Sequence, residues 1–257
     1  MLIQENYSRI LIEIVDGIAT LTLNRPDALN AVDDTMHSEL SRIFDDAQLD
    51  PNVRVVILTG AGKAFSSGGD TSAERAYSSD SGLSVIQEAS RIIRHLIDLD
   101  KPLIAAVNGH AVGLGATLAT LADISIVARG ARLGDPHVRV ALPAGNGSGI
   151  IWPLLIGVNR AKELLMLGDI ITAEDAQALG LISRVVEADV VLTEARNLAA
   201  RLVAIPPQAV RGTKASINGL LRMVANTLLP ASLAIEELAM RDPAFRQALQ
   251  ALEEGKK

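Results

Sequence analysis

The first part of the chain shows two patterns of apolar residues. One is typical of strands, and the other is typical of helices. Two apolar runs, Ile10–Val15 and Ile18–Leu23, flank the dipeptide Asp16-Gly17, which is a strong signal for a two-residue hairpin turn. After them, apolar residues recur at helical spacing through residues 32–47. The pattern therefore predicts a β-hairpin followed by an amphipathic helix.

Two short apolar strands follow, and each leads into a glycine-rich turn. The strands are expected at residues 53–58 and Leu103–Val107, and the turns read AFSSGGD (64–70) and NGHAVGLG (108–115). Both strands are too continuously apolar for a half-exposed position, so we expect both faces of the sheet to be covered. Glycine lets a backbone expose its amides to an oxyanion, although a single glycine-rich turn is more often only a turn.

Helical spacing of apolar residues at 85–96 precedes the second of these strands. Strands that alternate with helices predict right-handed crossovers and a mostly parallel sheet, with the site at the strand ends. Further along, Thr172 and Asp175 resemble a capping box, and Gly180 is a natural stop for the helix that it begins. Residues 206–250 then read as several helices.

Composition narrows the class of protein. The chain has 257 residues, 49% hydrophobic content and only 2% aromatic residues, so a large core must be built from aliphatic side chains. A net charge of -6 disfavours nucleic acid as a partner. The lack of cysteine excludes disulfides and thiol nucleophiles, and no histidine and carboxylate spacing suggests a metal site.

The start of the chain, MLIQENYSRI, has no basic segment and apolar run like those of a signal peptide, so we expect a cytoplasmic protein. Residues 103–128 hold one formal charge, Asp123, and are long enough to cross a bilayer. Asn108, Gly109 and His110 interrupt this window early. We therefore expect buried soluble core there, and no membrane span.

Four segments, taken in chain order, resemble a known family. They are NRPDALNA (24–31), VVILTGAGKAFSSGGD (55–70), NGHAVGLGATLATLADISIVA (108–128) and TAEDAQALGLISRVV (172–186). Over nearly the whole chain they resemble the enoyl-CoA hydratase/isomerase, or crotonase, superfamily. The resemblance implies an α/β fold of the ClpP/crotonase type, a spiral of ββα units. It implies a core at residues 1–200 and a C-terminal helical trimerisation region at 201–257. One such scaffold serves many reactions, so the family does not by itself name the reaction.

The resemblance implies an oxyanion hole formed by the backbone amides of Gly69 and Leu114. Hydratases of the family also carry two glutamates that handle the attacking water. This chain has Thr117 at the first of those positions and His137 at the second. Thr117 cannot act as a base at neutral pH, although its hydroxyl could orient a water. His137 keeps acid-base chemistry possible, but it could equally be a structural histidine that caps the turn after Pro136.

The loop LPAGNGSG (142–149), with the Pro-His pair upstream, is similar to cofactor-free β-diketone hydrolases of the 6-oxocamphor hydrolase type. In those relatives a histidine and an aspartate activate water for carbon-carbon cleavage. Asn146 stands where the aspartate would be, and it interrupts the expected pair. An acid could come from Glu236 or Glu237, but most glutamates on such a helix face water.

For the CoA moiety, relatives use the segments around residues 25–30 and 63–72. Arg25 and Lys63 are candidate cations there, although a charge beside a surface turn is usually only solvated. The GAGK run at 60–63 lacks the full phosphate-loop pattern, so nucleotide hydrolysis is not expected. The substrate-binding residues implied by the resemblance are Arg25, Ala28, Lys63, Ala64, Ser67, Gly68, Asp70, Thr71, Ser72 and Gly113.

Three functions remain open. The first is an acyl-CoA enzyme that stabilises an enolate in the oxyanion hole and uses His137, with either Asn146 or Asp70, for proton or water handling. It needs no cofactor beyond the CoA of its substrate. The second is a CoA-independent carbon-carbon bond hydrolase, and the third is a non-catalytic family member. A homotrimer or dimer of trimers is implied, without nucleic acid or membrane partners. His37 and His95 fall on predicted helices and are interpreted as surface or packing residues, and His110 as a pocket wall.

Overall fold

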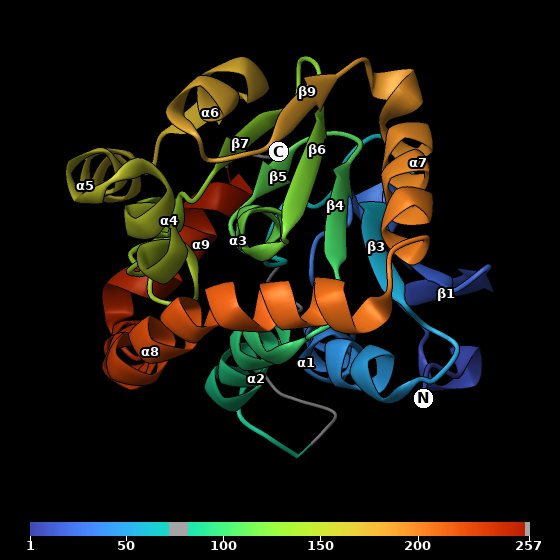
Figure 1. Ribbon diagram of the computed structural model, residues 1–257. Coiled ribbons are helices and arrows are strands. Elements are labelled where there is room, and N and C mark those ends of the chain that lie inside the picture. Colours follow the sequence, from blue (N-terminus) through green and yellow to red (C-terminus); the bar gives the residue numbers. More distant parts are fainter. Residues whose placement is uncertain (72–81, 255–257) are drawn as a thin grey trace.

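The computed structural model describes residues 1–71 and 82–254, so the predicted site residue Ser72 lies outside the described residues. A six-stranded sheet in the order β1-β2-β3-β4-β6-β9 forms the centre (Figure 1). Its strands are β1 (Ile10–Val15), β2 (Ile18–Leu23), β3 (Val55–Gly60), β4 (Leu103–Val107), β6 (Ile124–Ala128) and β9 (Arg184–Val186). Only the β1–β2 pair is antiparallel in this sheet, which confirms the mostly parallel prediction.

The predicted hairpin is present, and its turn has the backbone geometry that the sequence favours. Asp16 and Gly17 both adopt positive φ, 51° and 79°, as a two-residue hairpin turn requires. Strands β3 and β4 are buried along their whole length, as their continuous apolar character predicts. A smaller three-stranded sheet pairs β5 (Ala111–Val112), β7 (Arg132–Gly134) and β8 (Ile170–Thr172).

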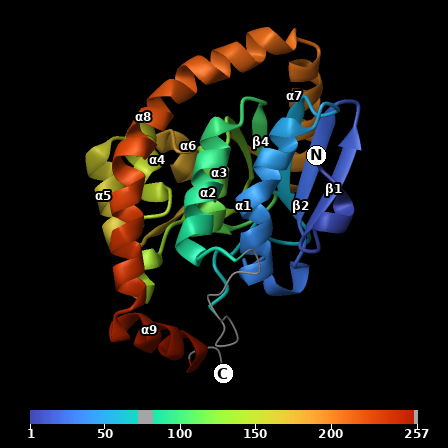
Figure 2. The ribbon, with the colours of Figure 1, turned by 90° about the horizontal axis from the view of Figure 1, so that it is seen from below.

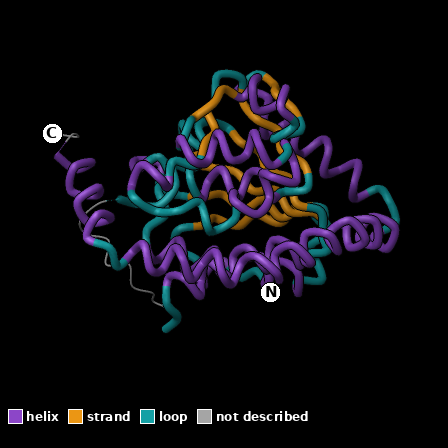
Figure 3. The backbone as a smooth tube through the Cα atoms, turned by 90° about the vertical axis from the view of Figure 1, so that its left-hand side faces the viewer, coloured by secondary structure: helices purple, strands orange, loops and turns teal. Residues whose placement is uncertain are grey.

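Helices surround the strands, which gather in the middle of the molecule in Figure 3. Helices α1 (Asp34–Leu49) and α2 (Val85–Asp98) pack side by side, as Figure 2 shows. Asp33 caps α1 by accepting the Met36 N–H, and Ser84 forms a capping box with Gln87 at the start of α2. Helix α3 (Leu114–Leu121) is entirely buried.

The second half of the chain is mainly helical. It contains α4 (Ser148–Ile156), α5 (Val158–Leu167), α6 (Ala173–Leu179), α7 (Val191–Val203), α8 (Pro207–Met240) and α9 (Pro243–Glu254). Thr172 caps α6 and Gly180 ends it in the left-handed conformation, as predicted. Helix α7 crosses the expected boundary between residues 200 and 201, and that division stays a prediction.

Buried polar contacts fix α8 to the core. Lys214 Nζ donates to the Lys101 carbonyl at 2.8 Å and pairs with Asp123 at 2.6 Å. The 103–128 window forms β4, β5, α3 and β6, as expected of buried core. In the described part of the chain, no helix is both long and apolar enough to span a membrane.

Candidate active site

The two glycine-rich turns pack directly against each other. Val112 N–H donates to the Ser66 carbonyl at 2.9 Å, and Ser66 N–H donates to the His110 carbonyl at 3.1 Å. A Cβ atom on Gly68 would lie 2.7 Å from the Val112 oxygen, so a side chain has no room there. Glycine at this position therefore allows the close backbone approach that the sequence predicts.

The two amides that the resemblance implies as oxyanion donors, those of Gly69 and Leu114, are not used in the hydrogen bonds between and around the turns. Val32 bonds to the groups on either side of Gly69, accepting from Asp70 N–H and donating to the Gly68 carbonyl, so the Gly69 N–H is not used in this pairing. Leu114 is the first residue of α3, where a helix offers its N–H no acceptor. Within residues 1–71 and 82–254, neither amide has a hydrogen-bond acceptor.

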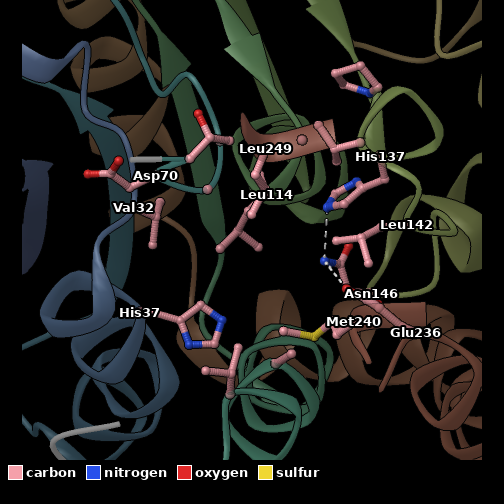
Figure 4. Close-up of a pocket in the computed structure, with 18 of the residues that line it drawn as sticks. Val32, His37, Asp70, Leu114, His137, Leu142, Asn146, Glu236, Met240 and Leu249 are labelled. Atoms are coloured by element: carbon pink, nitrogen blue, oxygen red, sulfur yellow. Dashed lines mark hydrogen bonds between the residues drawn. The ribbon is translucent and has the colours of Figure 1, made fainter. Parts of the chain in front are cut away.

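Both amides belong to residues that line one cavity of about 210 Å³ (Figure 4). The turns form one side of it, and residues of α8 and α9 form another. Nine of the predicted site residues line it, namely Ser67, Gly68, Gly69, Asp70, Thr71, Gly113, Leu114, His137 and Asn146. The rest of the lining is largely apolar, with Val32, Ala89, Leu142 and Met240 among it.

His137 enters the cavity from a short 3-10 helix, His137–Val140, that follows β7. Asp135 accepts the backbone N–H of His137 at 3.3 Å, which is an Asx-type turn favoured by Asp-Pro. The same carboxylate oxygen also hydrogen-bonds to Nδ1 of the His137 ring. Asp135 is fully buried, so one side chain both forms the turn and orients the imidazole.

This pairing shifts the protonation of both partners. Burial alone would lower the pKa of His137, but the charge and hydrogen bond of Asp135, with a smaller contribution from Glu236, raise it from 6.5 to about 9. Burial acts to raise the pKa of Asp135. The positive charge of His137 and the hydrogen bonds that Asp135 accepts outweigh burial and lower that pKa below its ordinary value. At neutral pH this histidine is therefore an imidazolium, whereas the sequence suggested a group titrating near neutrality.

Asn146 lies between His137 and a third titratable group, Glu236 of α8. Asn146 Nδ2 donates to Glu236 Oε1 at 3.2 Å and lies 3.4 Å from His137 Nε2 (Figure 4). Burial raises the pKa of Glu236 to about 7, even though His137 and the Asn146 hydrogen bond lower it. The expectation that this glutamate faces water is wrong, because its side chain is buried and lines the cavity.

Two buried polar atoms at this point have no partner in the described chain. They are Asn146 Oδ1 and Glu236 Oε2. Buried polar atoms are normally satisfied, so an unpaired pair beside a cavity indicates where a ligand or water binds. The cavity thus offers two backbone donors on one side and titratable groups on another.

Thr117 does not take part in this arrangement. It is fully buried behind the cavity lining, and its hydroxyl hydrogen-bonds to Ser148 Oγ at 3.0 Å. A Cβ on Gly147 would lie 2.3 Å from Thr117 Cγ2, so the loop after Asn146 closes tightly over it. The suggestion that the Thr117 hydroxyl orients a water in the site is therefore corrected.

The two segments implied for CoA lie side by side, and residues 67–71 of the second one line the cavity. Asn30 Nδ2 donates to the Ala64 carbonyl at 2.8 Å and joins the residue 25–30 segment, with Ala28 in it, to the start of the first glycine-rich turn. Arg25 pairs with Asp70 at 3.0 Å and with Asp33 at 3.3 Å, so protein carboxylates already neutralise it. Lys63 is exposed.

Sequence reasoning did not place three polar residues in the cavity region, although it named one of them, Glu236, as a possible source of an acid. Asp135 stands two positions before His137, and that spacing in a turn was the available signal. Glu236 lies on the buried stripe of α8 that also contains Ala225, Leu229 and Leu233. His37, interpreted as a surface or packing residue, lines the cavity. His110, expected as a wall, is exposed and accepts the Arg132 N–H instead.

The chain is similar to proteins of known family. A family model described as Enoyl-CoA hydratase/isomerase matches residues 13–257. The chain is 34% identical over 246 residues to the 1,2-epoxyphenylacetyl-CoA isomerase of Escherichia coli K12, with 94% of each chain covered. It is 34% identical over 212 residues to the short-chain-enoyl-CoA hydratase of Clostridium acetobutylicum, covering 82% of this chain and 81% of the relative. A crystal structure of an enoyl-CoA hydratase/isomerase from Mycobacterium paratuberculosis matches with a TM-score of 0.90 and 37% identity, covering 95% and 98% of the two chains.

Proposed function

The chain belongs to the enoyl-CoA hydratase/isomerase family, whose members process acyl-CoA, and on that premise we propose that it stabilises a thioester enolate between the amides of Gly69 and Leu114. One observation carries this proposal. The N–H groups of Gly69 and Leu114, which have no acceptor in the described part of the chain, come from turns that touch each other and line a single cavity. Donors held in place before the reaction stabilise charge that develops on an oxygen.

Proton transfer in this proposal uses Glu236 and His137 in place of a glutamate pair. Glu236 titrates near neutrality and accepts the proton from the carbon next to the thioester carbonyl. The electron pair of that C–H bond forms the enolate, whose oxygen binds the two amides. The His137 imidazolium, held by Asp135, supplies a proton to the product. Asn146 hydrogen-bonds to Glu236 and so keeps it beside the histidine.

CoA enters this proposal only as part of the substrate, with its nucleotide and pantetheine arm along residues 25–30 and 63–71. Lys63, which is exposed there, is the candidate phosphate cation, since Arg25 is already paired. We also retain a trimer or a dimer of trimers and a cytoplasmic location as proposals. Exposed apolar residues on α8 support assembly, because Ile217 is 65% and Leu220 51% exposed.

The experiment that tests enolate formation is exchange of the α-proton of a short acyl-CoA in D₂O, followed by NMR. Wild-type protein should exchange this proton faster than buffer does, whatever net reaction follows. Glu236→Gln should abolish the exchange, and Glu237→Gln, at the next position, should not. If wild-type protein binds a panel of short, branched and aromatic acyl-CoAs without any exchange, the enolate proposal is wrong and the non-catalytic alternative gains.

A second function has its own support in the Asp135–His137 pair. Glu236 titrates near neutrality and can take a proton from water, beside an imidazolium that Asp135 holds and that can donate one, as carbon-carbon hydrolysis of a β-diketone requires. The carboxylate comes from position 135, where the resemblance to diketone hydrolases placed it at 146. Turnover of a cyclic diketone, together with no measurable CoA affinity, would favour this function over the acyl-CoA one.

A further inference from the structure

His37 gives the cavity a second histidine, on the side away from His137. It lies on α1, and its ring faces the same space as Leu114 and Met240 (Figure 4). Other residues of the lining, such as Val32 and Ala89, are apolar. A polar ring in an otherwise apolar wall is the kind of isolated group that orients a ligand.

Glu88 of α2 fixes the orientation of this ring. His37 Nδ1 lies 2.7 Å from Glu88 Oε2, and the two side chains are 7% and 0% exposed. Since a carboxylate oxygen accepts, Nδ1 carries the hydrogen and Nε2 is the free edge of the ring. Nε2 has no hydrogen-bond partner within the described chain, and it is not sealed from solvent as the unpaired Nδ1 of His95 is.

Keeping this pair buried is costly. A carboxylate with no solvent exposure loses its hydration, and an apolar pair would join α1 to α2 without that cost. The pair holds one edge of the ring, Nε2, toward the cavity. A neutral ring accepts a hydrogen bond there from a hydroxyl, and an imidazolium donates one to a carbonyl.

We propose that His37, oriented by Glu88, binds a second oxygen of the substrate, on the acyl group. This inference rests on the proposed function, in which the thioester oxygen already occupies the amides of Gly69 and Leu114. The oxygen at His37 must then be another one, so the substrate class is an acyl-CoA that carries a hydroxyl or oxo group. The cavity volume of about 210 Å³ suits a short acyl chain of this kind.

The test compares three CoA esters of equal chain length, butyryl-CoA, 3-hydroxybutyryl-CoA and acetoacetyl-CoA, by calorimetric binding. Wild-type protein should bind one oxygenated ester about tenfold more tightly than butyryl-CoA, as one hydrogen bond to a buried group allows. Which of the two is preferred distinguishes a hydroxyl from an oxo ligand. His37→Gln should remove the preference and bring the affinity for the oxygenated ester down to that for butyryl-CoA, whereas His95→Gln, on α2 outside the cavity, should keep the preference.

Equal binding of the three esters by wild-type protein, or an equal loss for all three in His37→Gln, would overturn the inference while the proposed function stands. Failure of wild-type protein to bind any ester would overturn both. Should His37→Gln not fold, Glu88→Gln replaces it. That variant releases the ring, and it should reduce the preference for the oxygenated ester without abolishing butyryl-CoA binding.

Discussion

Asp135 hydrogen-bonds to the imidazole of His137 from two positions earlier in the same turn. The histidine therefore has a carboxylate partner, although Asn146 occupies the position where the resemblance placed one. The partner is local, so it needs no distant loop to form. Its negative charge keeps the ring protonated at neutral pH.

Replacement of Asp135 by asparagine should return the pKa of His137 from about 9 to 6.5 or below, because burial is then no longer opposed by a negative charge. The alkaline limb of the pH–rate profile should shift to lower pH by the same amount as the His137 pKa. The maximal rate should fall about 100-fold. The rate of acyl-CoA turnover from pH 5 to 10 measures both. Asp169→Asn, on an exposed aspartate paired with Arg139, is the control. An alkaline limb that stays in place would show that it does not report His137.

Stability should fall with rising pH because of His137. The folded protein holds this proton to about pH 9, whereas the unfolded chain releases it near 6.5. The contribution is complete below pH 6.5 and is lost on rising to 9, by at most about 1.4 kcal/mol per pH unit. Urea unfolding should compare the single variant Glu236→Gln with the double variant Glu236→Gln/His137→Gln. Neither protein has the Glu236 carboxyl, so the difference in their pH dependence reports the His137 proton. Parallel stability curves between pH 6.5 and 9 would contradict the assignment.

The free energy of unfolding of Glu236→Gln should increase relative to that of wild type as the pH rises from 4.5 to 7, and the difference should persist above pH 7. The unfolded carboxyl ionises near 4.5 and the folded one near 7, so wild-type stability falls between those values. We expect a difference on the order of 1–3 kcal/mol to develop across this window, alongside a loss of turnover of about 100-fold or more. Thermal unfolding and steady-state rates measure the two effects. Glu237→Gln, which loses only an exposed ion pair with Arg241, should change neither.

Leu114→Pro removes one proposed oxyanion donor without breaking the helix. Leu114 is the first residue of α3, a position that tolerates proline, and its N–H has no acceptor in the described chain. Turnover should fall about 100- to 1000-fold. Leu114→Ala keeps the N–H and should retain most activity, with circular dichroism as the check on folding. Similar rates for the two variants would exclude this amide as a donor.

Local rules predicted the elements whose structure depends on neighbouring residues. The Asp16-Gly17 turn, the Thr172 cap and the buried strands all follow from backbone preferences or continuous apolar runs, and they are present. Glu236 could not be placed in this way. Whether it faces solvent depends on how α8 packs against the core, and apolar residues are poor guides there, since Leu220 and Leu238 are 51% and 66% exposed.

The residues of the site also differ in whether sequence alone can identify them. The choice of Gly69 and Leu114 as donors comes from matching the family's motifs to the two turns, and their role stays a prediction. His37 and Glu88 could not be paired from sequence, since they lie on different helices and meet only when α1 packs against α2. Asp135 is the exception, because its spacing from His137 was available in the sequence.

Helices α8 and α9 supply Glu236, Met240 and Leu249 to a cavity whose reactive turns belong to the sheet. Substitutions in these two helices can therefore change the proposed acid and the shape of the cavity without altering the two turns. Exchanging the final helices for those of another family member offers a route to redesigned catalysts.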